Sequence, residues 1–459
     1  MRFGLEKELG KGTNVWTNLI WIFAAFVFIL IFWFWQVQNL ERKLNGPHYL
    51  IGFLILSFLY VLLFFSKIPI RFDQIGFYLG VFLRLFLVFL VPIFEDDWAR
   101  YLWDGWVIQE RGTPYGISPD SFFGDLDPVR AEILSRINHP DWPTIYGPVL
   151  EIYFYFSHAL FPWKLWALKL FLIIPDLILY FLIRNKFGIR SGLLYFWNPI
   201  LLKEIFLNAH PDILGVAILF FSIDQAEKGK YRSSFLLWGL SLAVKGFGIV
   251  VLPYLVYKFW KQDPDLKRLI VLACHSLLGF LLPYLPFLFF SKETDFLALT
   301  KFLGNFSFFP LGYTILLSAL GEISRYLWAV PSFVFTFIFL YKKRDRISIE
   351  EGIAGAYFLF FLFSPVVNAW YLLWVLPFLF PIDRTFWPSW ILLFVGQFSY
   401  LNYANMGNWR AVLEKGYYAH PDWLLNSLSI FSFSILGLWF WTRFYRKSSE
   451  IATNPSPLG

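Results

Sequence analysis

Residues 16–36 form an uninterrupted run without a charged side chain, and this run more than any other feature limits the folds open to the chain. About 20 apolar residues are enough for a helix to cross the hydrocarbon core of a bilayer. The run is strongly aromatic and lacks a small-residue cleavage site, which favours a membrane anchor over a removable signal peptide. Comparable runs follow at about 48–66 and 76–94, and apolar segments return after residue 146 almost continuously to about 442.

The composition agrees with a membrane protein of many spans. Hydrophobic residues make up 58% of the chain and charged residues 15%, against about 25% charged residues in ordinary soluble domains. A soluble fold cannot bury that much apolar surface in cores of normal size. The one cysteine, Cys274, excludes an intrachain disulfide framework and a metal site built from cysteines. The net charge of +7 does not indicate a nucleic-acid partner. In a membrane protein the positions of the positive charges indicate which loops are cytoplasmic.

The distribution of Lys and Arg predicts the topology. If the N-terminus is cytoplasmic, more than half of the 39 Lys and Arg fall into cytoplasmic pieces, as the positive-inside pattern requires. The polar segment 95–146 then lies on the outer side. Parity further requires that 147–161, which is too short to span comfortably, lies along the membrane surface as an interfacial helix.

We therefore predict an all-α fold, a polytopic bundle of about 12–14 transmembrane helices. Several of the later apolar segments are short or interrupted by Pro, Gly or charge, and such helices need protein or water around them. The expected parts are N-terminal transmembrane helices, an extracytoplasmic catalytic loop with interfacial helices, a transmembrane bundle and a disordered cytoplasmic tail. Their respective bounds are 1–94, 95–162, 163–442 and 443–459.

The densest polar cluster begins at the outer end of the third predicted span. Glu95, Asp96 and Asp97 are consecutive, and Arg100 follows Asp97 at a spacing that puts both on one helix face. Adjacent carboxylates raise one another's pKa and a nearby Arg lowers it, which leaves one ionised carboxylate able to act as a base. For the three acids alone, a solvated helix end is an equally good interpretation.

A second cluster, HPDWPTIYGP at 139–148, has the prolines and glycine of a rigid turn. His139, Asp141 and Tyr146 could line a site there, although a surface turn with its Tyr at the membrane interface is the simpler interpretation.

The third cluster places Lys203 and Glu204 inside an apolar stretch, followed by His210 and Asp212 in a turn on the outer side. Ionisable residues at membrane depth are usually functional. A Lys203–Glu204 pair that snorkels near a helix end is the alternative. Two residues at the spacing of His210 and Asp212 are only a weak metal signal.

Two further breaks between half-length helices are predicted on the outer side, at Lys245 and at 364–374. Arg100, Lys203 and Lys245 are three cations that parity places near the outer face. A phosphate group is the anion that would suit such a set.

Taken in order, these motifs resemble a known family. They are EDDWARYLWDG from Glu95, HPxxPTIYGP, WNP…KE…HPD, the Lys245-Gly pair and SP…WYLLW, and together they span about 76–381. They are similar to the polyprenyl-phosphate-sugar-dependent glycosyltransferases of the GT-C superfamily, with the bacterial polytopic mannosyltransferase-like family as the closest group. The resemblance implies a GT-C membrane bundle whose first large outer loop carries the catalytic carboxylate.

The resemblance also implies roles for individual residues. Asp96 or Asp97 matches the catalytic base, and the spacing to Arg100 favours Asp97. In the last motif the family often has His-Pro where Asn368 and Ala369 stand, so a hydrogen bond from Asn368 would have to replace a histidine. The residues expected to bind substrate are Arg100, Tyr101, His139, Tyr146, Lys203, Glu204, His210, Asp212, Lys245, Asn368, Trp370 and Tyr371.

The expected function is transfer of a hexose, with mannose the first candidate, from a polyprenyl-phosphate carrier to a glycan or lipid acceptor. The site would face the extracytoplasmic side of a bacterial inner membrane. The lipid-linked donor is the expected co-substrate, and a divalent cation is left open. The main alternative is a lipid or glycolipid flippase, which would have functional charges near the bilayer midplane and an internal repeat. A second is a non-catalytic partner in a cell-envelope assembly.

Overall fold

The computed structural model describes residues 14–44, 46–65, 73–124, 126–290, 297–343, 348–381, 386–403, 422–440 and 442. Within these ranges all regular elements are helices, joined by turns and irregular segments, and the one β-type contact is an isolated parallel bridge between Phe308 and Val366. The predicted all-α class is therefore confirmed for the described part of the chain. The predicted cytoplasmic tail, 443–459, lies outside the described residues.

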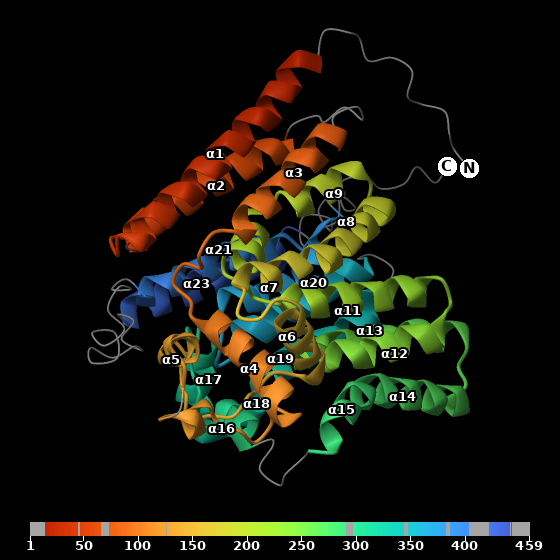
Figure 1. The fold of residues 1–459 in the computed structure, drawn as a ribbon. Coiled ribbons are helices and arrows are strands. Elements are labelled where there is room, and N and C mark those ends of the chain that lie inside the picture. The colour runs from red at the N-terminus through yellow and green to blue at the C-terminus, as the bar shows by residue number, and fades with distance from the viewer. Residues whose placement is uncertain are drawn as a thin grey trace, which may run out of the picture.

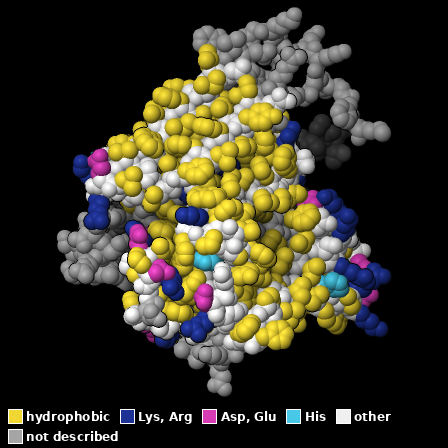
Figure 2. Space-filling model, viewed as in Figure 1, with side chains coloured by type: hydrophobic (Ala, Val, Ile, Leu, Met, Phe, Trp, Pro, Cys, Tyr) yellow, Lys and Arg dark blue, Asp and Glu magenta, His cyan; other side chains and the backbone are white. Residues whose placement is uncertain are grey.

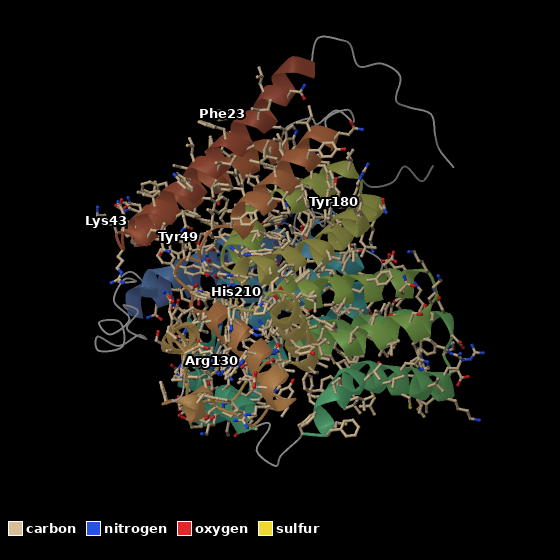
Figure 3. All side chains as sticks on the ribbon, viewed as in Figure 1. Phe23, Lys43, Tyr49, Arg130, Tyr180 and His210 are labelled. Atoms are coloured by element: carbon tan, nitrogen blue, oxygen red, sulfur yellow. The ribbon has the colours of Figure 1, made fainter. Side chains whose placement is uncertain are left out.

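The N-terminal part consists of α1 (Asn14–Leu40), α2 (Gly46–Phe65) and α3 (Asp73–Val88), with α1 and α2 side by side at one edge of the molecule (Figure 1). One face of α1 buries Trp21 and Trp35 against the bundle. The other face is exposed: Phe23, labelled in Figure 3, is 58% exposed and Trp33 is 53% exposed. Figure 2 shows hydrophobic side chains covering this whole region, as expected for a surface that meets lipid.

Four described helices are long and apolar enough to cross a membrane, and a fifth span results if one bent helix pair is counted together. They are Asn18–Leu40, Gly46–Leu63, Leu165–Phe187, Leu266–Leu288 and the pair Tyr313–Leu327 with Val330–Tyr341, bent by 77°. The other predicted spans are short or broken helices in the described ranges. A polytopic helical bundle is consistent with this, while the total of 12–14 crossings stays a prediction.

The third predicted span, 76–94, is shorter than expected because α3 ends at Val88. Lys169 of α7 (Leu165–Phe171) donates from Nζ to the carbonyl oxygens of Leu87 at 2.8 Å and Leu90 at 2.6 Å. A buried ammonium satisfies carbonyls that the helix leaves without an intrahelical partner. The chain is therefore free to turn away after Val88 toward the acidic cluster.

A buried ion pair joins α3 to α8 (Ile173–Phe187). Arg84 Nε lies 2.5 Å from Asp176 Oδ2, and both side chains are fully buried. Tyr195 of α9 (Ile189–Phe196) donates its hydroxyl to Asp176 Oδ1 at 2.7 Å. Three helices are thus tied together by groups that would be costly to bury singly.

The central helices α11 (Asp212–Glu227), α12 (Tyr231–Leu242) and α14 (Leu266–Leu281) pack in succession (Figure 1). α12 and α14 meet through glycine on both sides. A Cβ at Gly239 would lie 1.9 Å from the Ser276 carbonyl oxygen, and one at Gly279 would lie 2.0 Å from that of Leu236. Small residues at such a crossing let two helix backbones touch, a common device between membrane helices.

The segment predicted to lie on the outer side folds around α4 (Asp97–Arg111), α5 (Pro128–Ser135) and α6 (Pro148–Leu160), with its own apolar core. α4 and α6 cross closely at Gly105, where a Cβ would lie 2.5 Å from the Phe154 carbonyl oxygen. The predicted interfacial helix 147–161 is α6, and with 13 residues it is too short to span a bilayer. Its orientation along the membrane stays a prediction.

The remaining helical elements range from single turns to α23, which has 19 residues. They are η2 (Pro119–Phe122), α10 (Pro199–Leu201), η3 (Leu202–Leu207), η4 (Gly246–Val251), α13 (Leu252–Gln262), η5 (Leu282–Tyr284), α15 (Leu285–Leu288), α16 (Leu297–Asn305), α17 (Tyr313–Leu320), η6 (Gly321–Ile323), α18 (Ser324–Leu327), α19 (Val330–Ile338), η7 (Phe339–Lys343), α20 (Ile349–Leu362), η8 (Ala369–Trp374), η9 (Leu376–Leu379), α21 (Trp387–Gly396), η11 (Gln397–Tyr403) and α23 (Asp422–Phe440).

Candidate active site

Glu95, Asp96 and Asp97 lie where α4 begins. Asp96 occupies the N-cap position, with its carbonyl oxygen 2.9 Å from the Ala99 amide nitrogen, and Asp97 is the first helical residue. The helix dipole favours a carboxylate in this first turn. Asp96 and Asp97 are half-buried, whereas Glu95 is buried. The acids therefore stand between a packed interior and an accessible space.

The turn between η3 and α11 supplies the second part of the site. η3 is a π-helix, an irregularity that often marks functional positions, and Ala209 just after it has a positive φ of 67°. The Ile93 amide donates to Asn208 Oδ1 at 3.1 Å, which ties this turn to the segment that leads into the acids. His210 thereby comes to lie beside the acids, although more than 100 residues separate it from them in the sequence.

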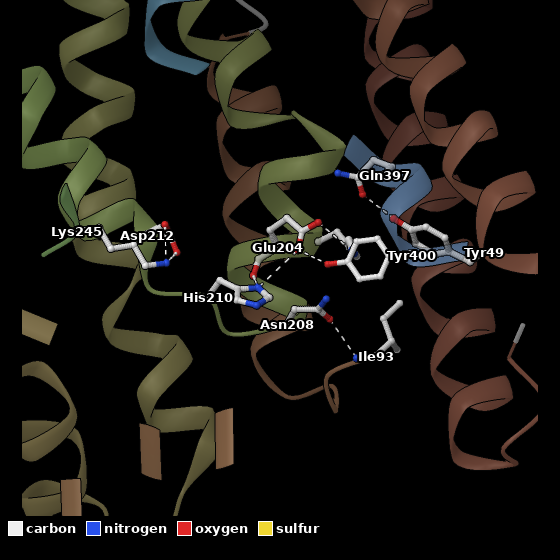
Figure 4. A network of polar contacts seen from close by, with 10 residues as sticks. Tyr49, Ile93, Glu204, Asn208, His210, Asp212, Lys245, Gln397 and Tyr400 are labelled. Carbon is white, nitrogen blue, oxygen red and sulfur yellow. Dashed lines mark hydrogen bonds and ion pairs between the residues drawn. The ribbon is translucent and has the colours of Figure 1, made fainter. Parts of the chain in front are cut away.

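His210 is fully buried and held in one orientation. Its ring stacks on Trp370 at 3.8 Å between ring centres, with 13° between the planes. Nδ1 lies 3.2 Å from the Glu204 carbonyl oxygen, and because a carbonyl can only accept, Nδ1 carries the proton. Nε2 is buried without a hydrogen-bond partner among the described residues, so its lone pair is available to a ligand. Figure 4 shows His210 between Glu204 and Asn208.

Glu95, Asp97 and His210 form a group that could hold a metal ion. One ligand atom from each lies within 4.8 Å of the other two. Ligands at about 2.1 Å from a cation are at most about 4.2 Å apart, so a shift of roughly half an ångström would close the site. Two carboxylates and an imidazole suit ions such as Zn²⁺ or Mn²⁺. The sequence suggested His210 and Asp212 as possible metal ligands. The structure places His210 in this group, whereas Asp212 is not part of it.

Asp212 is instead bound to Lys245. Lys245 Nζ lies 3.0 Å from Oδ1 and 2.8 Å from Oδ2, and Trp374 Nε1 donates to Oδ1 at 2.9 Å. The ammonium also lies 4.8 Å from the centre of the Tyr371 ring. Asp212 is fully buried, while the Lys245 side chain is 16% exposed. The pair thus keeps its carboxylate inside the protein and presents part of its cation outward.

The electrostatic surroundings of Asp97 join these parts. Burial raises the pKa of the Asp97 carboxyl above its ordinary range; His210, if it is protonated, and the Lys245 ammonium oppose this rise. Asp212 and His139 also contribute, the former raising and the latter lowering the pKa. A carboxyl group whose pKa is set by burial and by specific neighbours in an accessible position is typical of a functional site.

Each of the three predicted cations has a carboxylate partner of its own, and that of Lys245 is Asp212. Arg100 binds Asp104. Lys203 is fully buried, lies 2.8 Å from Glu204 Oε1 and stands 3.1 Å from the centre of the Tyr400 ring. Figure 4 shows Glu204 and Tyr400 on the side of His210 away from Lys245. Of these cations, Lys245 is the one whose charge reaches Asp97.

The remaining predicted residues line the neighbourhood to different degrees. The rings of Tyr101 and Tyr146 meet edge to face, with 5.2 Å between their centres. Burial raises the pKa of the Tyr146 hydroxyl, and the nearby charge of Asp97 raises it further. Asn368 is buried and hydrogen-bonds Tyr371. His139 is exposed and stacks on the Trp142 ring at 5.1 Å, at the surface of its turn.

Sequence reasoning missed two residues that the structure adds to the site. Trp374 stands three residues after Tyr371 in the same motif, so the helical spacing could have placed it beside Asp212. Asn208 is different, because its bond to Ile93 depends on a long-range contact that no local signal in the sequence reveals. The sequence shows Glu95 as part of the acidic run, but it does not predict that Glu95 lies close to His210.

Comparison with known protein families, with curated proteins and with solved structures finds no match for this chain.

Proposed function

We propose that this protein is an integral membrane glycosyltransferase of the GT-C type, which moves a hexose from a polyprenyl-phosphate carrier to a glycan or lipid acceptor. One observation carries the proposal: the half-buried Asp97 lies close to the buried His210 and Asp212 and to the partly exposed Lys245. A base next to a cation is what transfer from a phosphate leaving group needs.

The reaction would be a single displacement. The carboxylate of Asp97, or of the neighbouring Asp96, accepts the proton of an acceptor hydroxyl while that oxygen forms a bond to the anomeric carbon. The bond from this carbon to the phosphate oxygen breaks, and its electron pair leaves with the lipid phosphate. Attack opposite the leaving group inverts the anomeric centre, so a beta-linked donor gives an alpha product.

Lys245 is the residue proposed to bind the leaving phosphate. Its ammonium is partly exposed, and its two hydrogen bonds to Asp212 hold it in place without closing it off. An ammonium fixed in this way stabilises negative charge as it develops, with little reorganisation. Tyr371 and Trp370 border the same space from η8 and could stack on the sugar.

A divalent cation fits the donor set of Glu95, Asp97 and His210, and these residues would hold it. When bound, it would supply Lewis-acid stabilisation of phosphate charge. With Asp97 as a ligand, Asp96 would be the carboxylate that takes the proton from the acceptor.

The proposed setting is the outer face of a bacterial inner membrane. The acids lie at the end of α3 and at the start of α4, next to helices long enough to span a bilayer. A donor with a long lipid tail can keep its chain in hydrocarbon there while its phosphate reaches water.

The test is sugar transfer by the purified protein in lipid nanodiscs, with radiolabelled polyprenyl-phosphate mannose as donor. We expect transfer by the wild type and its loss in the Asp96→Asn/Asp97→Asn double variant. Asp127→Asn is the matched control, because Asp127 lies in the same outer segment but is an exposed N-cap that Asn can replace. Full transfer in the double variant would remove the proposed base.

The rival lipid flippase makes a different prediction in the same nanodisc preparation and in vesicles. Fluorescent lipid-linked sugar would cross the vesicle membrane without any sugar being transferred. That result, with no transfer of mannose, glucose or arabinose, would replace the enzyme proposal.

A further inference from the structure

Three ionisable side chains are buried together beneath the acids, where α4 crosses α6. Arg100 Nε lies 2.8 Å from Oδ1 and 2.9 Å from Oδ2 of Asp104, one turn later on α4. Glu151, in the first turn of α6, is fully buried and close enough for its charge to act on Asp104. One cation therefore faces two carboxyl groups in a site closed to water.

The hydrogen bonds around Glu151 indicate which carboxyl carries a proton. Asp104 has both oxygens on the Arg100 guanidinium, which favours its ionised form. Glu151 Oε1 accepts from Thr144 Oγ1 at 2.6 Å, and its Oε2 is buried without a hydrogen-bond partner among the described residues. An ionised carboxylate in that position would be costly, so the neutral acid is the stable form. Burial first, and then Asp104, raise the pKa of Glu151, while Thr144 and Arg100 oppose the rise.

The cluster fixes the turn 139–147 at two points. Arg100 Nη1 donates to the Trp142 carbonyl oxygen at 2.8 Å, and Thr144 is bound to Glu151. The turn is thereby held between α4 and α6, the two helices that the cluster joins. Two residues beyond Thr144 is Tyr146, whose hydroxyl lies near Asp97.

The same turn supports the segment that bears Lys245. A Cβ at Gly147 would lie 2.1 Å from the Ala243 carbonyl oxygen, and the Val149 amide donates to that oxygen at 3.3 Å. Ala243 is two residues before Lys245. A displacement of the turn would therefore move Tyr146 relative to Asp97 and would shift the support of Lys245.

We propose that Glu151, in its protonated form, is a positioning residue that locks the turn 139–147 against α4 and so sets Tyr146 and Lys245 around Asp97. This inference rests on the proposed function. The groups that face Glu151 in the described structure are Arg100 and Asp104 from α4 and Thr144 from the turn. Ionisation of Glu151 places a second negative charge beside Asp104 with one guanidinium to balance both, which loosens the lock.

The experiment compares Glu151→Gln, Glu151→Ala and the control Glu132→Gln in nanodiscs. Glutamine has the shape of the neutral acid and keeps an oxygen for Thr144, so we expect kcat/KM close to wild type at neutral pH. Alanine removes the lock, and a small displacement of the site should lower kcat/KM by about tenfold to a hundredfold. Glu132 is exposed on α5, and its change to Gln should have no effect.

Two readouts distinguish a lock from a merely structural role. The wild type should lose kcat/KM at alkaline pH, while Glu151→Gln should keep it, because the amide cannot ionise. Infrared spectroscopy should show the carbonyl band of a protonated carboxylic acid that is missing in Glu151→Gln. If Glu151→Gln is as impaired as Glu151→Ala and the wild type has no such band, the proposal is overturned.

The failure of the proposed function would leave this inference testable. If the wild type transfers no sugar, the infrared band and thermal unfolding decide. Because the folded protein holds the Glu151 proton more tightly than the unfolded chain, its stabilising effect is complete in acid and is lost as pH rises through the raised pKa. The melting temperature of Glu151→Gln should therefore fall less with rising pH than that of the wild type, and equal slopes would refute the lock.

Discussion

Lys245 and Asp212 come from different helix breaks, yet the Lys245 ammonium contacts both oxygens of the Asp212 carboxylate, at 2.8 and 3.0 Å. Asp212 is fully buried and also accepts the indole hydrogen of Trp374. These bonds hold both side chains in one position, so the pair differs from an exposed surface ion pair, which contributes little energy. Its position next to Asp97 makes Lys245 the first residue to test.

Lys245→Met should weaken donor binding. Removing a charged hydrogen-bonding group from a partly buried site costs about 1.5–3 kcal/mol, which corresponds to roughly a tenfold to hundredfold rise in KM for the lipid-linked sugar. Steady-state transfer assays over a range of donor concentrations measure this. Lys228→Met is the control, because Lys228 forms an exposed pair with Asp224. An unchanged KM would remove Lys245 from phosphate binding.

Metal binding can be measured without any activity. We expect the purified protein, once treated with a chelator, to bind one Mn²⁺ that electron paramagnetic resonance detects. Both His210→Ala and Glu95→Gln should weaken this binding by about tenfold or more, since each removes one of three protein ligands. Asp127→Asn should leave it intact. Equal binding by all variants would assign the ion to another place.

The pH dependence of transfer, measured in the presence of a chelator so that Asp97 is not a metal ligand, should report on Asp97. Its raised pKa means that the carboxyl becomes protonated, and useless as a base, at a higher pH than an ordinary aspartate would. Activity should therefore fall on the acid side at a pH above the usual aspartate range near 3.9. Lys245→Met removes a charge that lowers this pKa, so the acid limb should move to higher pH in that variant. An acid limb that stays in place would contradict the assignment.

The contact between α12 and α14 predicts a difference between two glycines. Gly239→Ala places a methyl group 1.9 Å from the Ser276 carbonyl oxygen, so the helices must separate, at a cost of about 1–3 kcal/mol. Gly437, on α23, has nothing within 4 Å of its Cβ position, and Gly437→Ala should stabilise the helix by about 0.5–1 kcal/mol. Thermal unfolding in detergent should show melting temperatures that move in opposite directions.

The buried ion pair between α3 and α8 predicts a larger loss. Arg84→Met leaves the fully buried Asp176 without its cation, which should destabilise the protein by about 3–5 kcal/mol. The double variant Arg84→Met/Asp176→Leu removes both charges and should recover a good part of this loss. Unfolding in denaturant measures both, and a single variant as stable as wild type would refute the role of the pair.

The helix breaks were the part of the fold most open to prediction. Pro211 and Gly246 stand at predicted interruptions, and the structure has helix boundaries there because proline lacks an amide hydrogen and glycine disfavours a continuing helix. The early end of α3 at Val88 was not predictable, since it depends on Lys169, a residue far along the chain. The number of membrane spans is difficult to predict for a similar reason, because hydropathy does not show where a helix ends or bends.

The site was predictable in its residue types and less so in its pairings. His210, Lys245 and the acids were all singled out by charge in an apolar setting. Which cation meets which anion depends on the fold: Lys203 is bound to its neighbour Glu204 and lies on Tyr400, and Arg100 is bound to Asp104. The three predicted cations thus have three different carboxylate partners, and no local feature of the sequence indicates which carboxylate each of them binds.

The hydrogen bonds from Lys169 to the end of α3 link the segment that leads to the acids to a helix long enough to span a membrane. Lys169 lies within Leu165–Phe187, a segment long enough to span the bilayer, and it holds the carbonyl groups from which the chain proceeds to Glu95. A change in bilayer thickness tilts a spanning helix. The ammonium would pass that tilt to the acidic segment, so we expect a change in lipid thickness to alter the distance between the acids and the rest of the candidate site.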